Sequence, residues 1–569
     1  MLDSEQSRAL DSPFVGSLLL LLLASALLLP GTAQFPLMDR DEPKFAQATH
    51  EMMERETWVV PYLNGEYRFD KPPLSYWWMR VHYWIFGKSE IGARLHSIIA
   101  AWLTAVVILH TGRFLYSPRA GLFAGVGWLT CLQVLIHGRL CVADMPMILF
   151  VTLSMLAMAK LLFAEEEPKR FGTWFWVLVV GQALGFLAKG PIANVTPLLA
   201  FILMRILFWR SPLPWKRLQP VALLVIALTI IGFWGVPALL QTENEFAKEG
   251  LGKHVVERGF QPFHNRVQIP VIYYLLTGFL SLFPWSAFFP IALRRDVEKT
   301  DHQARSRAFL LSWFLAPHLI FAFYSTQLPH YVMPGFPAFF LLLFASGRWP
   351  RPSGKLERRW FVLVMIAIGV LFATIAGIVV FSPFRTALPG MSHVLLAACL
   401  AIFLLGFMGL LTSWGKTSRF AFAVVLLGII IHTALTQLRT IFPAKVLAEK
   451  LSSLPPKTKF TACKFTEPSL IFYSKWNYPW KLSSKIEQTL TWLEREGPKA
   501  CVLLKREWRV TDSLDAWTSG DTVEPASDHT AELGSLEQFR ARYNIYEVSG
   551  FNSARSSWVE LVVLISRRD

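Results

Sequence analysis

Long uninterrupted runs of apolar residues constrain this 569-residue chain more than any other feature of its sequence. The first run covers residues 17–33 and consists mainly of leucine and alanine. Charged residues make up only 17% of the chain, whereas a soluble protein typically carries about 25%. An apolar stretch of about 20 residues is long enough to span a bilayer as a helix. The sequence therefore predicts a polytopic α-helical membrane protein.

Apolar runs that can form transmembrane helices recur through the first 440 residues. We expect about thirteen helices, at residues 17–33, 95–110, 120–136, 142–163, 174–188, 192–208, 221–240, 269–292, 309–324, 331–344, 360–381, 394–411 and 420–438. The first run follows one arginine and three acidic residues, whereas a signal peptide has a basic segment there. We therefore expect an uncleaved first helix.

Lysine and arginine are distributed unequally among the segments that connect these runs. The segments of one set hold 21 cations, whereas the short loops of the opposite set hold three, namely Arg139, Lys189 and Arg385. Because cytoplasmic loops of membrane proteins are enriched in cations, the richer side is predicted to be cytoplasmic. This excess accounts for the net charge of +16, and no basic arm or zinc-finger spacing indicates a nucleic-acid partner. Two outer loops, at about 34–93 and 241–268, and the C-terminal tail are then expected outside the cytoplasm.

The composition changes near residue 441, which divides a transmembrane domain (1–440) from a tail (441–569). Residues 460–465, 500–504 and 559–565 have the pattern of short strands, and 470–475 and 484–496 that of helices. The tail is predicted to be a small α/β domain. Cys463 and Cys501 could form a disulfide there if the tail lies outside the cytoplasm.

The first outer loop carries the first group of candidate functional residues. Asp41 precedes Pro43 and a helical pattern, so it either charges a helix N-terminus or acts as an acid–base group. Residues 74–86 are rich in Trp and Tyr and predict an amphipathic helix at the membrane surface. Lys71 precedes Pro72-Pro73, and Lys189 precedes Gly190-Pro191. Each lysine is either an interfacial anchor or a cation placed for an anionic substrate.

Two further groups have alternative interpretations. Arg139 and Asp144 lie five residues apart, so they either form a buried ion pair or belong to a site. His254 and Glu257 lie one helical turn apart, a spacing that suits two metal ligands and also a solvated amphipathic helix. A third ligand, such as Asp70, would be needed for a metal site.

Taken together and in this order, several motifs resemble the bacterial GT-C glycosyltransferases. The similar branch includes the 4-amino-4-deoxy-L-arabinose transferases of lipid A and is related to the protein O-mannosyltransferases. The motifs are Asp41-Glu42-Pro-Lys-Phe-Ala, Trp58-Val-Val-Pro-Tyr-Leu-Asn64-Gly65, Asp70-Lys71-Pro72-Pro73-Leu-Ser-Tyr-Trp, Ala93-Arg94-Leu, Arg139 with Asp144-Met, Ala188-Lys189-Gly190-Pro191, Lys253-His254 and Arg266 with Tyr273-Tyr274. The resemblance covers about residues 30 to 345, and more weakly the tail at Glu467-Pro-Ser-Leu.

The resemblance implies an inverting transfer of a monosaccharide, such as 4-amino-4-deoxy-L-arabinose or a hexose, from a polyprenyl phosphate carrier to a lipid A, glycan or protein acceptor. It implies a multi-pass protein of the bacterial inner membrane, with the site and the C-terminal domain facing the periplasm. Asp41 and Asp144 would be catalytic. The substrate-binding residues would be Lys71, Lys189, Arg139 and Tyr331. Asp70 and His254 match positions for a divalent metal, and Gln327 stands where many relatives have lysine.

Two other classes of function remain open on the sequence alone. A transporter or lipid flippase would favour ionisable residues at the membrane midplane and symmetric halves, and no internal repeat is visible. A non-catalytic scaffold would only display the C-terminal domain. The sequence favours the transferase. In that reaction the lipid phosphate leaves the sugar, and cations beside it stabilise the charge that develops on it.

Overall fold

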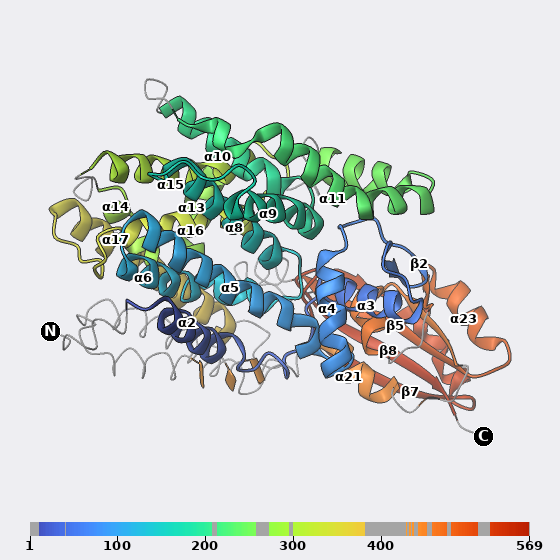
Figure 1. Cartoon of the computed structure of the whole chain (residues 1–569). Coiled ribbons are helices and arrows are strands. Elements are labelled where there is room, and N and C mark those ends of the chain that lie inside the picture. Colours follow the sequence, from blue (N-terminus) through green and yellow to red (C-terminus); the bar gives the residue numbers. More distant parts are fainter. Residues whose placement is uncertain are drawn as a thin grey trace.

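The structure is a computed structural model of the whole chain (Figure 1). It describes residues 11–39, 41–207, 213–257, 272–294, 300–381, 442–451, 458–474, 479–509 and 524–567, with isolated positions between 428 and 454. Two predicted helices, 394–411 and 420–438, fall almost entirely outside the described residues. The same holds for the second outer loop from residue 258 onward.

A bundle of apolar helices forms the larger part of the described chain (Figure 1). Its helices are α2 (Pro13–Leu28), α5 (Glu90–Leu115), α6 (Pro118–Leu129), α7 (Leu132–His137), α8 (Asp144–Phe163), α9 (Thr173–Lys189), α10 (Ile192–Leu207), η1 (Trp215–Leu218), α11 (Pro220–Gln241), η2 (Phe246–Glu257), α13 (Ile272–Ser281), η4 (Trp285–Phe288), α14 (Phe289–Ala292), α15 (Asp301–Ala322), η5 (Pro329–Gly335), α16 (Phe336–Leu343) and α17 (Lys355–Phe381). The bundle confirms the predicted architecture of apolar helices at this level of detail.

Close packing in the bundle depends on small residues. Helices α5 and α6 approach each other at Gly112 and Gly121, where a Cβ on Gly121 would lie 2.1 Å from the carbonyl oxygen of Leu109. Any larger side chain at position 121 would force the two helices apart. Small residues at such contacts are typical of helices that pack within a membrane.

Three helical segments among the described residues are long and apolar enough to cross a membrane by themselves. They are Glu90–Leu115, Asp144–Phe163 and Trp215–Gln241. A bent pair, Ile272–Ser281 and Trp285–Ala292, would make a fourth crossing if the two helices act as one span. The figure of thirteen spans therefore stays a prediction.

The described part of the C-terminal tail forms a mixed six-stranded sheet in the order β4-β3-β5-β8-β7, with β6 beside β5. The strands are β3 (Lys459–Cys463), β4 (Lys481–Ser483), β5 (Lys499–Arg509), β6 (Ser527–Asp528), β7 (Tyr543–Asn552) and β8 (Ser557–Ser566). The three predicted strands are confirmed as β3, β5 and β8. Strands β4, β6 and β7 were not predicted.

Successive residues of a strand point to opposite faces of a sheet. Because the strands carry apolar residues on both faces, helices cover both faces of this sheet. Helices α21 (Pro443–Leu451) and α22 (Pro468–Tyr473) share a core with one set of strand residues, and α23 (Ile486–Glu494) and α25 (Thr530–Leu533) share a core with the other. Cys463 and Cys501 lie in that second core, and both are free thiols. The disulfide that the sequence allowed is not formed.

The first outer loop lies between the helical bundle and the sheet domain (Figure 1). It contains α3 (Asp41–Glu54), a short hairpin of β1 (Tyr62–Leu63) and β2 (Glu66–Tyr67), and α4 (Leu74–Phe86). Both predicted helices of this loop are present. Ten of the fourteen residues of α3 are buried, because this helix packs on α4 and on α22 of the sheet domain.

Candidate functional site

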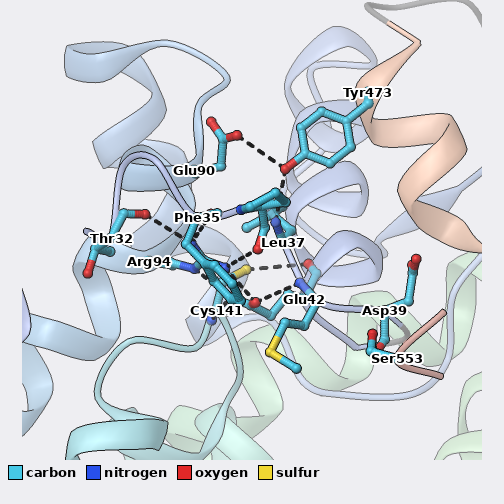
Figure 2. A network of polar contacts seen from close by, with 12 residues as sticks. Thr32, Phe35, Leu37, Asp39, Glu42, Glu90, Arg94, Cys141, Tyr473 and Ser553 are labelled. Atoms are coloured by element: carbon cyan, nitrogen blue, oxygen red, sulfur yellow. Dashed lines mark hydrogen bonds and ion pairs between the residues drawn. The ribbon is translucent and has the colours of Figure 1, made fainter. Parts of the chain in front are cut away.

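Helix α3 begins at an ion pair that fixes its first turn to the bundle. The Glu42 carboxylate accepts two hydrogen bonds from the Arg94 guanidinium, at 2.8 and 2.7 Å, and both side chains are only 2% exposed. Arg94 also donates to the carbonyl oxygens of Thr32, Phe35 and Pro36 (Figure 2). Since the loss of one partner from such a buried pair costs about 3–5 kcal/mol, the N-terminus of α3 is firmly anchored.

Asp41, the candidate base, is the residue immediately before this anchor. Its side chain is exposed, whereas that of Glu42 is buried. A carboxylate in the first turn of a helix is stabilised by the helix dipole, so the capping role remains compatible with the structure. The exposed position also leaves Asp41 accessible to a substrate that enters from outside the bundle.

A second group of charges surrounds Asp70 at the other end of the loop. Its two carboxylate oxygens accept hydrogen bonds from Arg68 and Lys71, each at 2.8 Å. Burial opposes the charge of Arg68, but Tyr76, Asp70 and Asp41 together raise the pKa of its guanidinium above the ordinary value. The negative charges of Asp41 and Asp70 therefore both stabilise the positive charge of Arg68.

The third group lies where α8 and α9 meet η5. Lys189, the last residue of α9, donates to Oδ1 of Asp144, the first residue of α8, at 2.5 Å. Nε2 of His330 lies 3.7 Å from the same oxygen. The Lys189 ammonium also lies 5.5 Å from the ring centre of Tyr331. The structure thus brings together three residues predicted for the site, Asp144, Lys189 and Tyr331.

Sequence reasoning missed two histidines of this group. The rings of His137 and His330 lie 4.5 Å apart, and Gln133 bonds to Nδ1 of His137 at 2.8 Å. No spacing rule links positions 137 and 330, because they come from separate helices. The one local signal was that His330 directly precedes Tyr331.

The ion pair predicted as an alternative between Arg139 and Asp144 is wrong. Arg139 donates instead to the carbonyl oxygens of Leu135 and Leu27, and Asp144 pairs with Lys189. The turn after α7 directs the arginine back toward α2. Its role in substrate binding stays a prediction that these contacts do not favour.

The segments that carry Lys71 and Lys189 pack against each other. Phe69 and Leu74, on either side of Lys71, share a hydrophobic cluster with Leu187 of α9, two residues before Lys189. Trp234 of α11 and Phe246 of η2 complete the cluster. The two candidate phosphate-binding lysines therefore belong to one connected region.

The described residues around Asp70 do not fit a divalent metal. Both Asp70 oxygens already bond to cations, and two positive side chains oppose a third positive charge. No group of three or more His, Cys, Asp and Glu side chains suited to a metal occurs within the described part of the chain. His254 lies in η2, but its side chain is outside the described residues.

An apolar cavity of about 520 Å³ lies between α8, α9, α10 and α11. Its lining includes Phe186, Pro191, Leu198, Leu224 and Trp215. Phe186 and Pro191 flank Lys189 in the chain. A long hydrocarbon chain would therefore find an apolar environment within a few residues of the lysine.

Comparisons with known proteins show what this chain is similar to. Residues 70–233 match the family described as dolichyl-phosphate-mannose-protein mannosyltransferase. The undecaprenyl phosphate-α-4-amino-4-deoxy-L-arabinose arabinosyl transferase of Yersinia enterocolitica is 29% identical over 331 residues, which are 58% of each chain. The equivalent Yersinia pestis protein (strain Pestoides F) is also 29% identical, over 336 residues. The matched region spans a little over half the length of these curated relatives.

The fold comparison extends over nearly the whole chain. The crystal structure of ArnT from Cupriavidus metallidurans bound to undecaprenyl phosphate superposes with a TM-score of 0.74, at 17% identity, over 96% of this chain and 97% of that one. The apo structure of the same protein gives a TM-score of 0.72 at 18% identity, over 97% and 98% of the two chains. These likenesses show that the chain has the fold of ArnT from Cupriavidus metallidurans, in agreement with the GT-C fold that the resemblance implies.

Proposed function

We propose that this protein transfers a monosaccharide from a polyprenyl phosphate carrier to a lipid A, glycan or protein acceptor. The observation that carries the proposal is the Lys189–Asp144 pair beside Tyr331, at helix ends that pack against the Lys71 segment. The segments that carry the two lysines pack together, the apolar cavity borders the Lys189 segment, and Asp41 is exposed at the start of α3. The 29% identity to aminoarabinose transferases supports the same chemistry.

The lysines would act on the leaving group. Cleavage of the bond between sugar and phosphate converts a phosphate diester with one negative charge into a monoester with two. Fixed cations bind the second state more tightly than the first, so they lower the barrier and not only the dissociation constant. Asp144 and Asp70 would hold the two ammonium groups in place.

Asp41 would act on the acceptor. A carboxylate can remove the proton of an acceptor hydroxyl as the oxygen attacks the anomeric carbon. A single displacement of this kind inverts the anomeric configuration. The apolar cavity between α8 and α11 would take part of the prenyl tail, because its walls are almost entirely hydrocarbon.

The proposed orientation places this site and the sheet domain on the periplasmic side of a bacterial inner membrane. The excess of cations in the opposite set of loops supports it. A periplasmic site suits a lipid-linked donor, since nucleotide sugars are made in the cytoplasm.

Donor cleavage by the purified protein tests this function. The full chain in detergent or vesicles is supplied with polyprenyl phosphate aminoarabinose or hexose and with lipid A, glycan or peptide acceptors. We expect ³¹P NMR to show conversion of the diester into the monoester, and ¹H couplings to show an inverted anomeric centre. Movement of intact donor across the vesicle without any monoester would identify a flippase instead, and retention would exclude the single displacement.

Mass spectrometry then identifies the substrates in cells. Lipids and surface glycans are compared between cells with and without the gene. A mass difference of one sugar on a lipid or glycan that depends on the gene would name both the sugar and the acceptor. Identical profiles under conditions of expression would count against the transferase.

A further inference from the structure

The tail motif Glu467-Pro-Ser-Leu forms the start of α22, with Glu467 directly before its first residue, and α22 packs on α3 of the first outer loop. Phe472 of α22 shares a hydrophobic cluster with Phe45 and Met52 of α3 and with Tyr83 of α4. The sheet domain therefore contributes to the core of the loop that carries Asp41. None of these residues has a role in the transfer described above.

Asp39 is bound from two sides by the sheet domain. One of its carboxylate oxygens accepts the backbone N–H of Ser469 at 3.0 Å, and the other accepts the Ser469 hydroxyl. Its backbone carbonyl accepts the Ser553 hydroxyl at 3.0 Å (Figure 2). Asp39 lies only two residues before Asp41.

Glu467 fixes the two serines relative to each other. Its carboxylate accepts a hydrogen bond from Asn552 at 3.1 Å and pairs with Arg555 at 3.3 Å. Asn552 ends β7, and Ser553 follows it in the turn to β8. This 97%-buried glutamate thus joins α22 to the turn, and the two segments meet Asp39 as one unit.

Two more contacts tie the loop to the same domain. The Tyr473 hydroxyl accepts the backbone N–H of Leu37 at 2.9 Å and donates to Glu90 at 3.2 Å (Figure 2). Asn64 exchanges hydrogen bonds with the backbone of Trp480, at 2.9 and 2.7 Å. Glu51 of α3 in turn binds the backbone N–H groups of Asn64 and Gly65. Both ends of α3 are therefore held.

We propose that α22 and the β7–β8 turn position the Asp41 carboxylate for catalysis. This inference rests on the proposed function of Asp41 as the base. Glu42 is fixed to the bundle through Arg94, and Asp39 is fixed to the sheet domain through Ser469 and Ser553. Asp41 lies between the two anchors, so removal of the second would leave the exposed carboxylate mobile. A misplacement of about 1 Å can lower a rate by roughly 100-fold.

The test compares Ser469→Ala and Ser553→Ala with Ser557→Ala in the full-length protein. Ser557 provides a matched control because its hydroxyl also donates to a carboxylate, Glu507, but within the sheet domain. For each of the two anchoring serines we expect kcat to fall about tenfold, while KM for the polyprenyl phosphate donor changes less than twofold. The donor affinity should persist because Lys71 and Lys189 are held by the bundle and their own acids. The control should match the wild type.

Hydrogen–deuterium exchange provides a readout that needs no substrate. The peptide covering residues 36–44 should exchange faster in Ser469→Ala and Ser553→Ala than in Ser557→Ala. Unchanged exchange together with an unchanged kcat would overturn the proposal. The contacts of Ser469 and Ser553 with Asp39 would then only pack the sheet domain against the loop. Faster exchange in a protein whose wild type cleaves no donor would support the anchoring of the loop and refute the proposed function.

Discussion

The two lysines of the candidate site each lie beside a carboxylate, Lys71 beside Asp70 and Lys189 beside Asp144. An ammonium group has three donors, so it can bond to its carboxylate and to a phosphate at the same time. In the proposed transfer, the carboxylates would orient the lysines before the donor arrives. This preorganisation is what makes a fixed cation effective in the transition state.

Lys71→Ala and Lys189→Ala should each lower turnover by about 100-fold, comparable to the loss of one preorganised donor. The double variant should lose less than the product of both effects, because groups that act on one phosphate are not independent. Initial rates with a defined polyprenyl phosphate sugar measure this. Lys505→Ala, which removes a lysine paired with an exposed glutamate in the sheet domain, is the control. A single variant with most of its turnover would show that its lysine is only an interfacial anchor.

Asp41→Asn tests the base directly. The amide keeps the size of the side chain and its ability to cap α3, but it cannot accept the proton. We expect a folded protein with severely reduced transfer and unchanged donor binding, measured by thermal shift and by titration with the carrier lipid. Near-normal turnover would leave Asp41 only its role at the helix N-terminus.

Sequence patterns named several candidate residues that lie together in the structure, but they did not predict which contacts these residues make. Asp144, Lys189 and Tyr331 lie close together, and their roles in a site stay predictions. The partner of Asp144 was mistaken because Arg139 is nearer in sequence, whereas Lys189 is nearer in space by the packing of α9 on α8. His137 and His330 meet only through the tertiary fold, so no local pattern could indicate their contact.

At the scale of elements, the turn between α4 and α5 carries a partly buried lysine. Lys88 donates to Gln47 of α3 at 2.9 Å and lies 5.2 Å from the Phe472 ring centre. Burial lowers its pKa to about 7, against the opposing influence of Glu54 and Glu51. Lys88 follows α4 and contacts α3 and α22, so we expect the stability of their packing to depend on pH.

The sign of this coupling follows from the two pKa values. Between pH 7 and the ordinary lysine pKa of 10.5, the unfolded chain holds a proton that the folded chain has lost. Stability should therefore rise with pH in this window, with a slope of at most about 1.4 kcal/mol per pH unit. Thermal shift from pH 7 to 9.5 measures it, and Lys88→Gln should remove this contribution. An equal slope in the variant would assign the effect to other groups.

Element prediction succeeded where apolar residues alternate or recur over a long stretch. Strand β8 reads Val559-Glu-Leu-Val-Val-Leu-Ile and was recognised, as were α3 and α4. Strand β7 reads Tyr543-Asn-Ile-Tyr-Glu-Val-Ser-Gly. It was not predicted because its polar residues and glycine interrupt the apolar pattern of a strand. It is a strand because it lies at the edge of the sheet and pairs with β8 along its full length. The strand therefore depends on pairing in the folded protein and not on a strong local sequence pattern.

At the scale of the molecule, the cation asymmetry predicts how the chain crosses the membrane. A reporter fused after Asp569 should be active outside the cytoplasm, and one inserted near Lys299 should be active inside. The reason is that one set of loops holds 21 cations, whereas the short loops of the opposite set hold three. Alkaline phosphatase and green fluorescent protein fusions distinguish the two compartments. The opposite pattern would place the site in the cytoplasm and contradict the proposed use of a periplasmic donor.

The whole-molecule arrangement was the least predictable level. Composition separated the sheet domain from the bundle, but nothing in the sequence indicated that Tyr473 and Ser469 contact the first outer loop. Such contacts join residues more than 400 positions apart and leave no periodicity. The weak resemblance at Glu467-Pro-Ser-Leu was the one local sign that this part of the tail is constrained.

The hydrogen bond between Ser553 and Asp39 joins two positions that are 514 residues apart. Translation at about 5–20 residues per second makes Asp39 roughly half a minute to two minutes before Ser553. During that interval Asp39 has been synthesised, but the segment that completes its second anchor does not yet exist. Chains that stop short of this turn would occupy the membrane with an incompletely held Asp41. Biosynthesis itself thereby delays the second anchor of Asp39 until Ser553 has been made.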